Sequence, residues 1–178
     1  LMSATVAWFT GLSGSGKSAI ADRVAEILRN QARRVRIIDG DEVRATAHRH
    51  LGFNPEDIRE NNRLVALLCQ ESLAQFDIIL VPIISPFRDS REAARRLLGE
   101  AFAEVYVKAS LHEVMKRDPK GHYKAVQEGT LTGFIGIGEQ VPYEPPESAD
   151  VVLDTEAHRL EECANELVGL LISKAAIP

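Results

Sequence analysis

The sequence predicts an α/β fold of three layers, in which a parallel sheet of about five strands lies between helices. The pattern of apolar residues along the chain predicts it. Short apolar runs rich in β-branched residues alternate along the chain with longer runs whose apolar residues recur at helical spacing. Such alternation is typical of parallel strands joined by right-handed crossovers. With 178 residues the chain has the size of one domain, so we expect a single domain over residues 1–178.

The first strand, expected at Ala4–Thr10, runs into a glycine-rich loop that fits the phosphate-loop pattern G-x-x-x-x-G-K-[ST] at every fixed position. Ala19–Arg29 then carries apolar residues at helical spacing, so the loop has the strand before it and the helix after it that the motif requires. Lys17 would add charge at the β- and γ-phosphates of a triphosphate, and the Ser18 hydroxyl could hold Mg²⁺. The predicted phosphate-binding residues are Gly11, Leu12, Ser13, Gly14, Ser15, Gly16, Lys17 and Ser18.

Two acids follow the second expected strand, Val35–Ile38. Asp39 and Asp41 should lie on the same rim as Lys17, because ligands of open parallel sheets bind at the carboxyl ends of the strands. The alternative is a solvated Asp-Gly turn in which Asp41 caps a weak helix over residues 42–50.

The remaining elements continue the alternation. Pro82 indicates that the third strand ends or bulges near that residue. The expected ranges are a long helix from Glu56 with an apolar face that includes Phe76, a strand at Asp77–Ile84, a helix at Arg91–Leu98, a strand at Ala103–Val107, a short helix at Leu111–Arg117, a final core strand at Val151–Leu153 and a closing helix through Leu160 and Leu171.

Residues 118–146 interrupt this alternation, since they carry glycines, prolines, tyrosines and basic residues but no sustained apolar period. A segment of this length without helices or strands is usually functional or disordered. We expect a mobile lid that closes over a substrate; the alternative is an inert surface loop.

Composition excludes several classes of protein. The formal net charge of −5 gives no support for attraction to a nucleic-acid backbone. No apolar run approaches the roughly 20 residues of a membrane helix, and no signal peptide precedes the first strand, so a cytoplasmic protein is expected. Cys69 and Cys163 are predicted to be buried free thiols. The first residues, Leu1 and Met2, leave open that the chain is part of a longer polypeptide.

The surroundings of the phosphate loop favour a small kinase. The base-reading N-K-x-D of a GTPase is missing, and the acids follow the second strand rather than the third. Phosphoryl transfer requires Mg²⁺, cations around the γ-phosphoryl group, a positioned hydroxyl and a carboxylate to accept its proton. Lys17, Ser18, Asp41 and the basic residues of the lid could supply these parts.

The chain resembles the adenylylsulfate kinases, which use ATP to phosphorylate the 3′-hydroxyl of adenosine 5′-phosphosulfate (APS) and form 3′-phosphoadenosine 5′-phosphosulfate (PAPS). The resemblance covers nearly the whole chain and implies a phosphate-loop kinase fold. The motifs that carry it are residues 11–18, Asp-Gly-Asp-Glu-Val-Arg at 39–44, Leu-Gly-Phe-Asn at 51–54, Ile-Ser-Pro-Phe-Arg at 84–88, Glu-Val-Tyr-Val at 104–107, Arg-Asp-Pro-Lys-Gly at 117–121 with Tyr123-Lys124, and Val-Pro-Tyr-Glu-Pro-Pro at 141–146.

The resemblance implies roles for individual residues. Asp41 would orient or deprotonate the acceptor hydroxyl, with Lys17 and Ser85 as the other residues at the reacting centre; Ser85 is expected to position rather than to carry the phosphoryl group. Asp39 would hold Mg²⁺ with Ser18 and border the acceptor, and Arg117 would lie on the ATP side of the lid. The further residues expected to bind the sulfonucleotide are Arg44 and Asn61 by contact, Phe53 and Phe134 as an adenine sandwich, and Lys120 at its charged end. For Phe53 the alternative is a hydrophobic plug under a loop.

ATP and Mg²⁺ are the implied cofactor set, and APS is the implied acceptor. A homodimer and a fused or associated ATP sulfurylase are further expectations.

The chain departs from the family pattern at the start of the long helix. Asp-Arg followed by Asn-Ile-Arg-Arg is usual there, whereas this chain has Asp57-Ile58 and then Asn61-Asn62-Arg63-Leu64. Two expected arginines are therefore replaced, by Ile58 and Leu64, and Ile135 stands where the family usually has Thr. These departures leave two alternatives open: a kinase of the same fold that acts on another nucleotide-linked acceptor, and an ATP-binding regulatory domain.

Overall fold

The computed structural model of the protein describes residues 3–46, 49–132, 134–136 and 141–175. Its centre is a five-stranded parallel sheet of order β2-β3-β1-β4-β5, which confirms the predicted sheet. The strands are β1 (Thr5–Thr10), β2 (Val35–Ile37), β3 (Ile78–Val81), β4 (Phe102–Lys108) and β5 (Val151–Asp154). The helices are α1 (Lys17–Asn30), α2 (Gly40–Ala45), α3 (Pro55–Ser72), α4 (Arg88–Leu98), α5 (Leu111–Arg117), α6 (His122–Gln127) and α7 (Leu160–Ala175), with a 3₁₀ turn at Gly99–Ala101.

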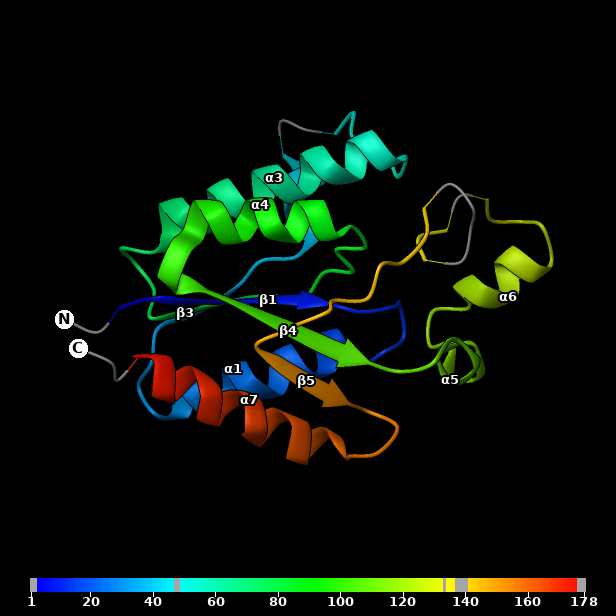
Figure 1. Ribbon diagram of the computed structural model, residues 1–178. Helices are drawn as coiled ribbons and strands as arrows, with labels where there is room; N and C mark the ends of the chain where they lie inside the picture. Colours follow the sequence, from blue (N-terminus) through cyan, green and yellow to red (C-terminus); the bar gives the residue numbers. More distant parts are fainter. Residues whose placement is uncertain (1–2, 47–48, 133, 137–140, 176–178) are drawn as a thin grey trace.

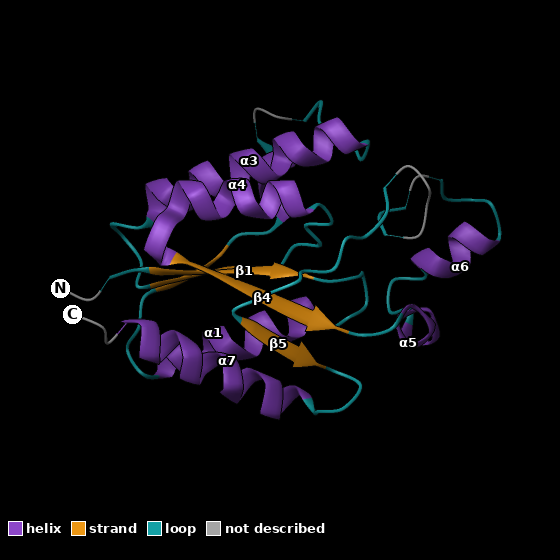
Figure 2. Cartoon of the chain, in the orientation of Figure 1, coloured by secondary structure: helices purple, strands orange, loops and turns teal. Residues whose placement is uncertain are grey.

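Helices cover both faces of the sheet, which gives the three predicted layers. Helices α1 and α7 lie against one face and α3 and α4 against the other, while α5 and α6 lie beyond the carboxyl end of β4 (Figure 1; Figure 2). The central strand β1 shows why both layers form. All of its residues are buried, and because strand side chains alternate, Ala7 and Phe9 pack into the α1–α7 core whereas Val6 and Trp8 pack into the α3–α4 core.

Several boundaries differ from the prediction for identifiable reasons. Strand β3 ends at Val81 rather than at residue 84, because Pro82 cannot donate a ladder hydrogen bond. Helix α3 ends at Ser72, although Phe76 still packs against the α3–α4 core. The final strand predicted at 151–153 is present as β5. It is an edge strand, in which Leu153 is buried in the α1–α7 core, Val151 packs against that core and Val152 is exposed.

The weak helix predicted over residues 42–50 is shorter and begins earlier, at Gly40. Its N-cap is Asp39, whose carboxylate accepts hydrogen bonds from the backbone N–H groups of Asp41 and Glu42. The prediction that Asp41 caps this helix is therefore wrong, and Asp41 keeps its carboxylate free of the cap.

Segment 118–146 is not devoid of regular structure, because α6 lies within it. Both cysteines are buried free thiols, as predicted. None of the helices in the described part of the chain combines the length and the apolar character needed to cross a membrane.

Candidate active site

The phosphate loop joins the buried end of β1 to the first residue of α1, so the backbone N–H groups of a helix start face the loop. Its glycines are required by geometry. Gly16 has φ of 110° and Gly14 has φ of 81°, a left-handed region that disfavours other residues. A Cβ at Gly11 would lie 2.4 Å from the carbonyl oxygen of Val107. The loop sequence is thus fixed by close backbone approach as well as by phosphate chemistry.

Lys17 is 7 % exposed and folds back over the loop, where its Nζ donates to the carbonyl oxygens of Gly11 at 2.9 Å and Leu12 at 2.7 Å. Burial, together with the smaller effect of the positive charge on nearby Lys120, lowers the pKa of Lys17 to about 7. The ligand-free site therefore holds a lysine whose charge is poorly compensated. An anionic phosphate chain would supply the missing compensation.

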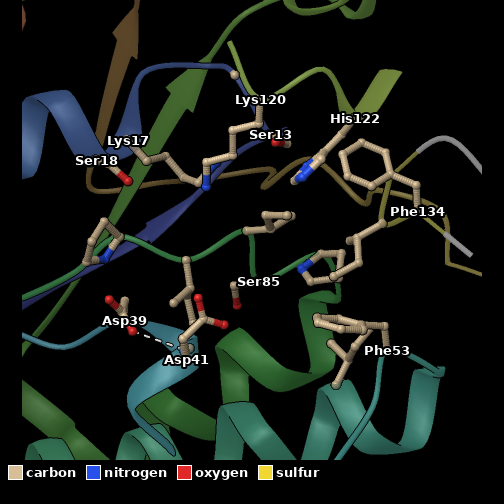
Figure 3. Close-up of a pocket in the computed structure, with 18 of the residues that line it drawn as sticks. Ser13, Lys17, Ser18, Asp39, Asp41, Phe53, Ser85, Lys120, His122 and Phe134 are labelled. Carbon is tan, nitrogen blue, oxygen red and sulfur yellow. Dashed lines mark hydrogen bonds between the residues drawn. The ribbon is translucent and has the colours of Figure 1, made fainter. Parts of the chain in front are cut away.

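A cavity of about 730 Å³ lies at the carboxyl ends of the strands and brings most of the predicted site residues together. Figure 3 shows Lys17 and Ser18 on one side of it and Asp39 and Asp41 on the other. The predicted residues that line it are Ser13, Gly14, Gly16, Lys17, Ser18, Asp39, Asp41, Arg44, Phe53, Asn61, Ser85, Lys120 and Phe134. Gly11, Leu12, Ser15 and Arg117 do not line this cavity.

The two acids on the rim differ in their surroundings. Asp39 uses one carboxylate oxygen, Oδ1, for both capping hydrogen bonds. The Asp41 side chain is 91 % exposed, and its nearest cation is the Arg44 guanidinium at 4.0 Å. Asp41 is therefore the acid available to a bound hydroxyl.

Arg44 and Phe53 form one wall of the cavity. The Arg44 guanidinium lies over the Phe53 ring at 4.4 Å from its centroid, which leaves the outer face of the ring open, and Phe53 is 54 % exposed. The exposure does not fit a hydrophobic plug. Desolvation lowers the pKa of Arg44, with Asp41 and Asp57 acting in the opposite direction. Asn61 ties this wall to α2, because its Nδ2 donates to the Gly40 carbonyl oxygen at 3.2 Å.

Ser85 lies at the base of the cavity in a strained conformation, with φ of 44° and 2 % exposure. Its hydroxyl accepts a hydrogen bond of 3.0 Å from the indole Nε1 of Trp8. Its carbonyl oxygen accepts hydrogen bonds from Arg91 at 2.7 Å and Thr10 at 3.0 Å. These contacts fix the strained turn that borders the cavity.

Phe134 and Lys120 come from segment 118–146 and lie across the cavity from Phe53 (Figure 3). The Phe134 ring meets the rings of Tyr123 and His122 edge to face, at centroid distances of 5.1 and 5.3 Å. The Tyr123 hydroxyl donates to the Ser13 carbonyl oxygen at 2.7 Å and so fastens α6 to the phosphate loop. The first half of the segment is thus held against the site.

A second cavity of about 490 Å³ lies beside the phosphate loop and includes Ser15 and Arg117 in its lining. The Arg117 guanidinium donates to the Thr155 hydroxyl at 3.0 Å and to its carbonyl oxygen at 3.1 Å. Thr155 and His158 line this cavity too, and sequence reasoning missed them because they follow β5 in no recognisable motif. The only signal available was their position after the carboxyl end of a strand.

The two replaced arginines have different environments. Ile58 is 2 % exposed, lines the large cavity and packs with Phe87 and Val141. Leu64 packs against the α3–α4 core and does not line the cavity. Arg59 does not take over for Ile58, because its guanidinium stacks on Phe87 at 4.1 Å and pairs with Asp89.

A phosphate loop, an acidic rim across a shared cavity and an adjoining second cavity define a small-molecule kinase of the phosphate-loop fold. A family model described as adenylylsulphate kinase matches residues 3–154. The chain belongs to the adenylylsulfate kinase family.

Relatives agree with this assignment. An adenylyl-sulfate kinase of Bacillus licheniformis is 45 % identical over 165 residues, which are 92 % of this chain and 83 % of the relative. A probable adenylyl-sulfate kinase of Aeropyrum pernix is 40 % identical over 169 residues, covering 93 % and 91 % of the two chains. Among solved structures, the Mycobacterium tuberculosis APS kinase CysC in complex with AMPPNP and APS superposes with a TM-score of 0.89 at 34 % identity, covering 97 % of this chain and 99 % of that one.

Proposed function

We propose that the protein transfers the γ-phosphoryl group of ATP to the 3′-hydroxyl of APS and releases ADP and PAPS. The observation that carries the proposal is the placement of Lys17 and Asp41 on facing sides of one cavity, in a chain of the adenylylsulfate kinase family (Figure 3). A cavity of about 730 Å³ also has the size of sites for small ligands.

ATP would lie with its phosphates in the loop and its base in the second cavity, beside Arg117. The phosphate chain replaces the carbonyl partners of Lys17, and the anionic charge raises the pKa of this lysine from its value of about 7. Lys17 then stays protonated and stabilises the charge on the transferring group. Arg117 is already held by Thr155, so its guanidinium needs little further ordering.

The residues present fit Mg²⁺, which prefers oxygen ligands. The Ser18 hydroxyl lies in the first turn of α1, and Asp39 has one carboxylate oxygen left over from its cap. These two groups would hold the ion, which would neutralise negative charge on the phosphates when bound.

Asp41 would accept the proton of the acceptor hydroxyl. In the transfer, the hydroxyl oxygen forms a bond to the γ-phosphorus, the bond from that phosphorus to the β,γ-bridging oxygen breaks, and ADP leaves. The Asp41 carboxylate is exposed and free of the helix cap, so it can bind the hydroxyl directly. Ser85 positions the turn beneath the acceptor.

A steady-state assay with ATP, Mg²⁺ and APS tests the proposal. Wild type should form PAPS and ADP in equal amounts, and Lys17→Ala should reduce turnover at least 100-fold, a loss in the range of a removed charge-stabilising donor. Thermal unfolding of the variant checks that the fold is intact. Turnover of another nucleotide-linked acceptor in preference to APS would contradict the proposed acceptor, and ATP binding without turnover of any acceptor would favour a regulatory domain.

A further inference from the structure

Three buried side-chain atoms have no hydrogen-bond partner within the described ranges: Arg44 Nε, Asn62 Oδ1 and His122 Nδ1. All three residues line the large cavity. Buried polar atoms are nearly always paired, so unpaired atoms gathered around one cavity indicate groups that a ligand satisfies. Asn62 differs from the other two, because it has no role in the site described above and is 4 % exposed.

The chemistry of the unpaired Asn62 atom follows from its other contact. The amide Nδ2 donates to the carbonyl oxygen of Ile58 at 2.8 Å. A carbonyl oxygen accepts only a donor, so this contact fixes which end of the amide is nitrogen. The free end is therefore an oxygen, so a residue of the cavity lining carries a buried hydrogen-bond acceptor that has no partner among the described residues.

We propose that Asn62 is a specificity-determining residue whose Oδ1 accepts a hydrogen bond from the exocyclic amine of the acceptor nucleotide's base. The inference rests on the proposed function, because it assumes that this nucleotide occupies the large cavity. The phosphosulfate end of the nucleotide offers only acceptors, which Asn62 Oδ1 would repel. The ribose 3′-hydroxyl is the group assigned to Asp41. The base amine is the remaining strong donor besides the 2′-hydroxyl.

The neighbours of Asn62 also suit a base. Ile58 lies one helical turn away on α3, and its side chain is buried with Phe87 in an apolar cluster that borders the cavity. The side chains of this cluster are apolar, which suits a purine and disfavours an anion. Together, Ile58 and Asn62 replace the arginine and isoleucine that the family pattern places at these two positions of one helix face.

The test measures dissociation constants by calorimetry for APS and for the matching purine nucleoside phosphosulfate, which lacks the amine. Wild type should bind APS about tenfold more tightly, the usual size of one hydrogen bond to a neutral group. Asn62→Ile and Asn62→Leu should reduce this preference to about twofold or less. Removal of the 2′-hydroxyl, tested with the 2′-deoxy analogue of APS, should lower affinity by the same factor in the variants and in wild type.

Two further readouts complete the test. Gln70→Ile, an equivalent amide-to-aliphatic change at an exposed position of α3, should leave the preference unchanged. Asn62→Ile should raise the Tm of the ligand-free protein by about 2–6 °C, because it removes an unsatisfied buried acceptor. The inference is overturned if both Asn62 variants still bind APS about tenfold more tightly than the analogue without the amine. It is also overturned if the variants change only the affinity ratio between APS and its 2′-deoxy analogue. Because binding is measured without turnover, an inactive but nucleotide-binding protein would count against the proposed function alone.

Discussion

Lys17 shows how one residue prepares the site for its ligand. Among the described residues its ammonium group contacts only neutral oxygens, and burial holds its pKa near 7. The unfolded chain binds the proton more tightly, so between about pH 7 and pH 10 this group makes the ligand-free protein more stable as pH rises. A bound triphosphate has the opposite effect on Lys17, because its negative charge favours the protonated form of the lysine.

ATP binding should therefore take up a proton at Lys17 above neutral pH. At about pH 8 the free lysine is mostly neutral and uptake should approach one proton, whereas at about pH 6 it is already charged and contributes almost none. Calorimetry with Mg²⁺ and ATP in buffers of different ionisation enthalpy measures the difference. Lys17→Arg, which stays charged, should abolish it. Equal uptake at both pH values in wild type would show that Lys17 is charged before ATP binds.

Asp41 should act on the reaction rather than on binding. Asp41→Asn keeps the shape and the hydrogen-bonding reach but cannot accept a proton, so we expect kcat to fall by about 100-fold or more while the KM for APS changes by less than about threefold. Steady-state kinetics with APS varied at saturating ATP gives both values. An equal effect on kcat and KM would assign Asp41 to substrate binding.

At the scale of elements, a buried ion pair connects α4, β4 and the end of segment 118–146. Arg91 and Glu104 have side chains 2 % and 10 % exposed and lie 3.1 Å apart. Burial raises the pKa of Glu104, which Arg91 opposes. The Arg91 guanidinium also donates to the carbonyl oxygens of Ser85 at 2.7 Å and Glu144 at 2.6 Å. One side chain thus holds both the strained turn beneath the acceptor site and the segment's return to the core.

Removal of the Arg91 side chain should destabilise the folded protein. Arg91→Met leaves Glu104 buried without its partner, so the free energy of unfolding should fall by about 3–5 kcal/mol, and the double variant with Glu104→Leu should recover most of it. Urea unfolding measures both. Arg96→Met serves as the control, because Arg96 pairs with Glu92 on an exposed surface and should change stability by less than about 1 kcal/mol. If Arg91→Met also lowers the free energy of unfolding by less than about 1 kcal/mol, the contacts of Arg91 do not hold the Ser85 turn.

The sequence predicted which helices and strands form more accurately than where each of them begins and ends. The phosphate loop was predictable because its motif is contiguous and its flanking strand and helix are local signals. The N-cap of α2 was not, since Asp39 and Asp41 are both good capping residues and only the backbone path selects between them. Helix α6 was missed because it is short and its single buried residue, Tyr123, gives no apolar period.

At the scale of the whole molecule, the order of the strands assembles the site. Strand β1 lies between β3 and β4. The crossover from β1 to β2 and the crossover from β3 to β4 run toward opposite edges of the sheet, so a crevice opens at the carboxyl end of β1. The phosphate loop, the Ser85 turn and the acidic rim after β2 meet there, and described residues of segment 118–146, Lys120 and Phe134 among them, line the same cavity.

The arrangement of the whole molecule also explains which features of the site could not be predicted from the sequence. That Asp39 and Asp41 share a rim with Lys17 follows from strand order, and the alternation of elements predicted it. The unpaired oxygen of Asn62 and the left-handed backbone of Ser85 depend on contacts between distant segments, which no local pattern encodes. The second cavity likewise forms only when residues after β5 meet the phosphate loop.

In the proposed reaction, Lys17 and Asp41 face one another across a bound acceptor whose 3′-hydroxyl is phosphorylated. The most direct measurement compares APS with its 3′-deoxy analogue in the presence of Mg²⁺ and ATP, with nucleotide products separated and identified by phosphorus NMR. We expect APS to yield PAPS with the new phosphate on the 3′-oxygen, and the 3′-deoxy analogue to yield no phosphorylated nucleotide. A phosphate at another position of APS, or phosphorylation of the 3′-deoxy analogue, would contradict it.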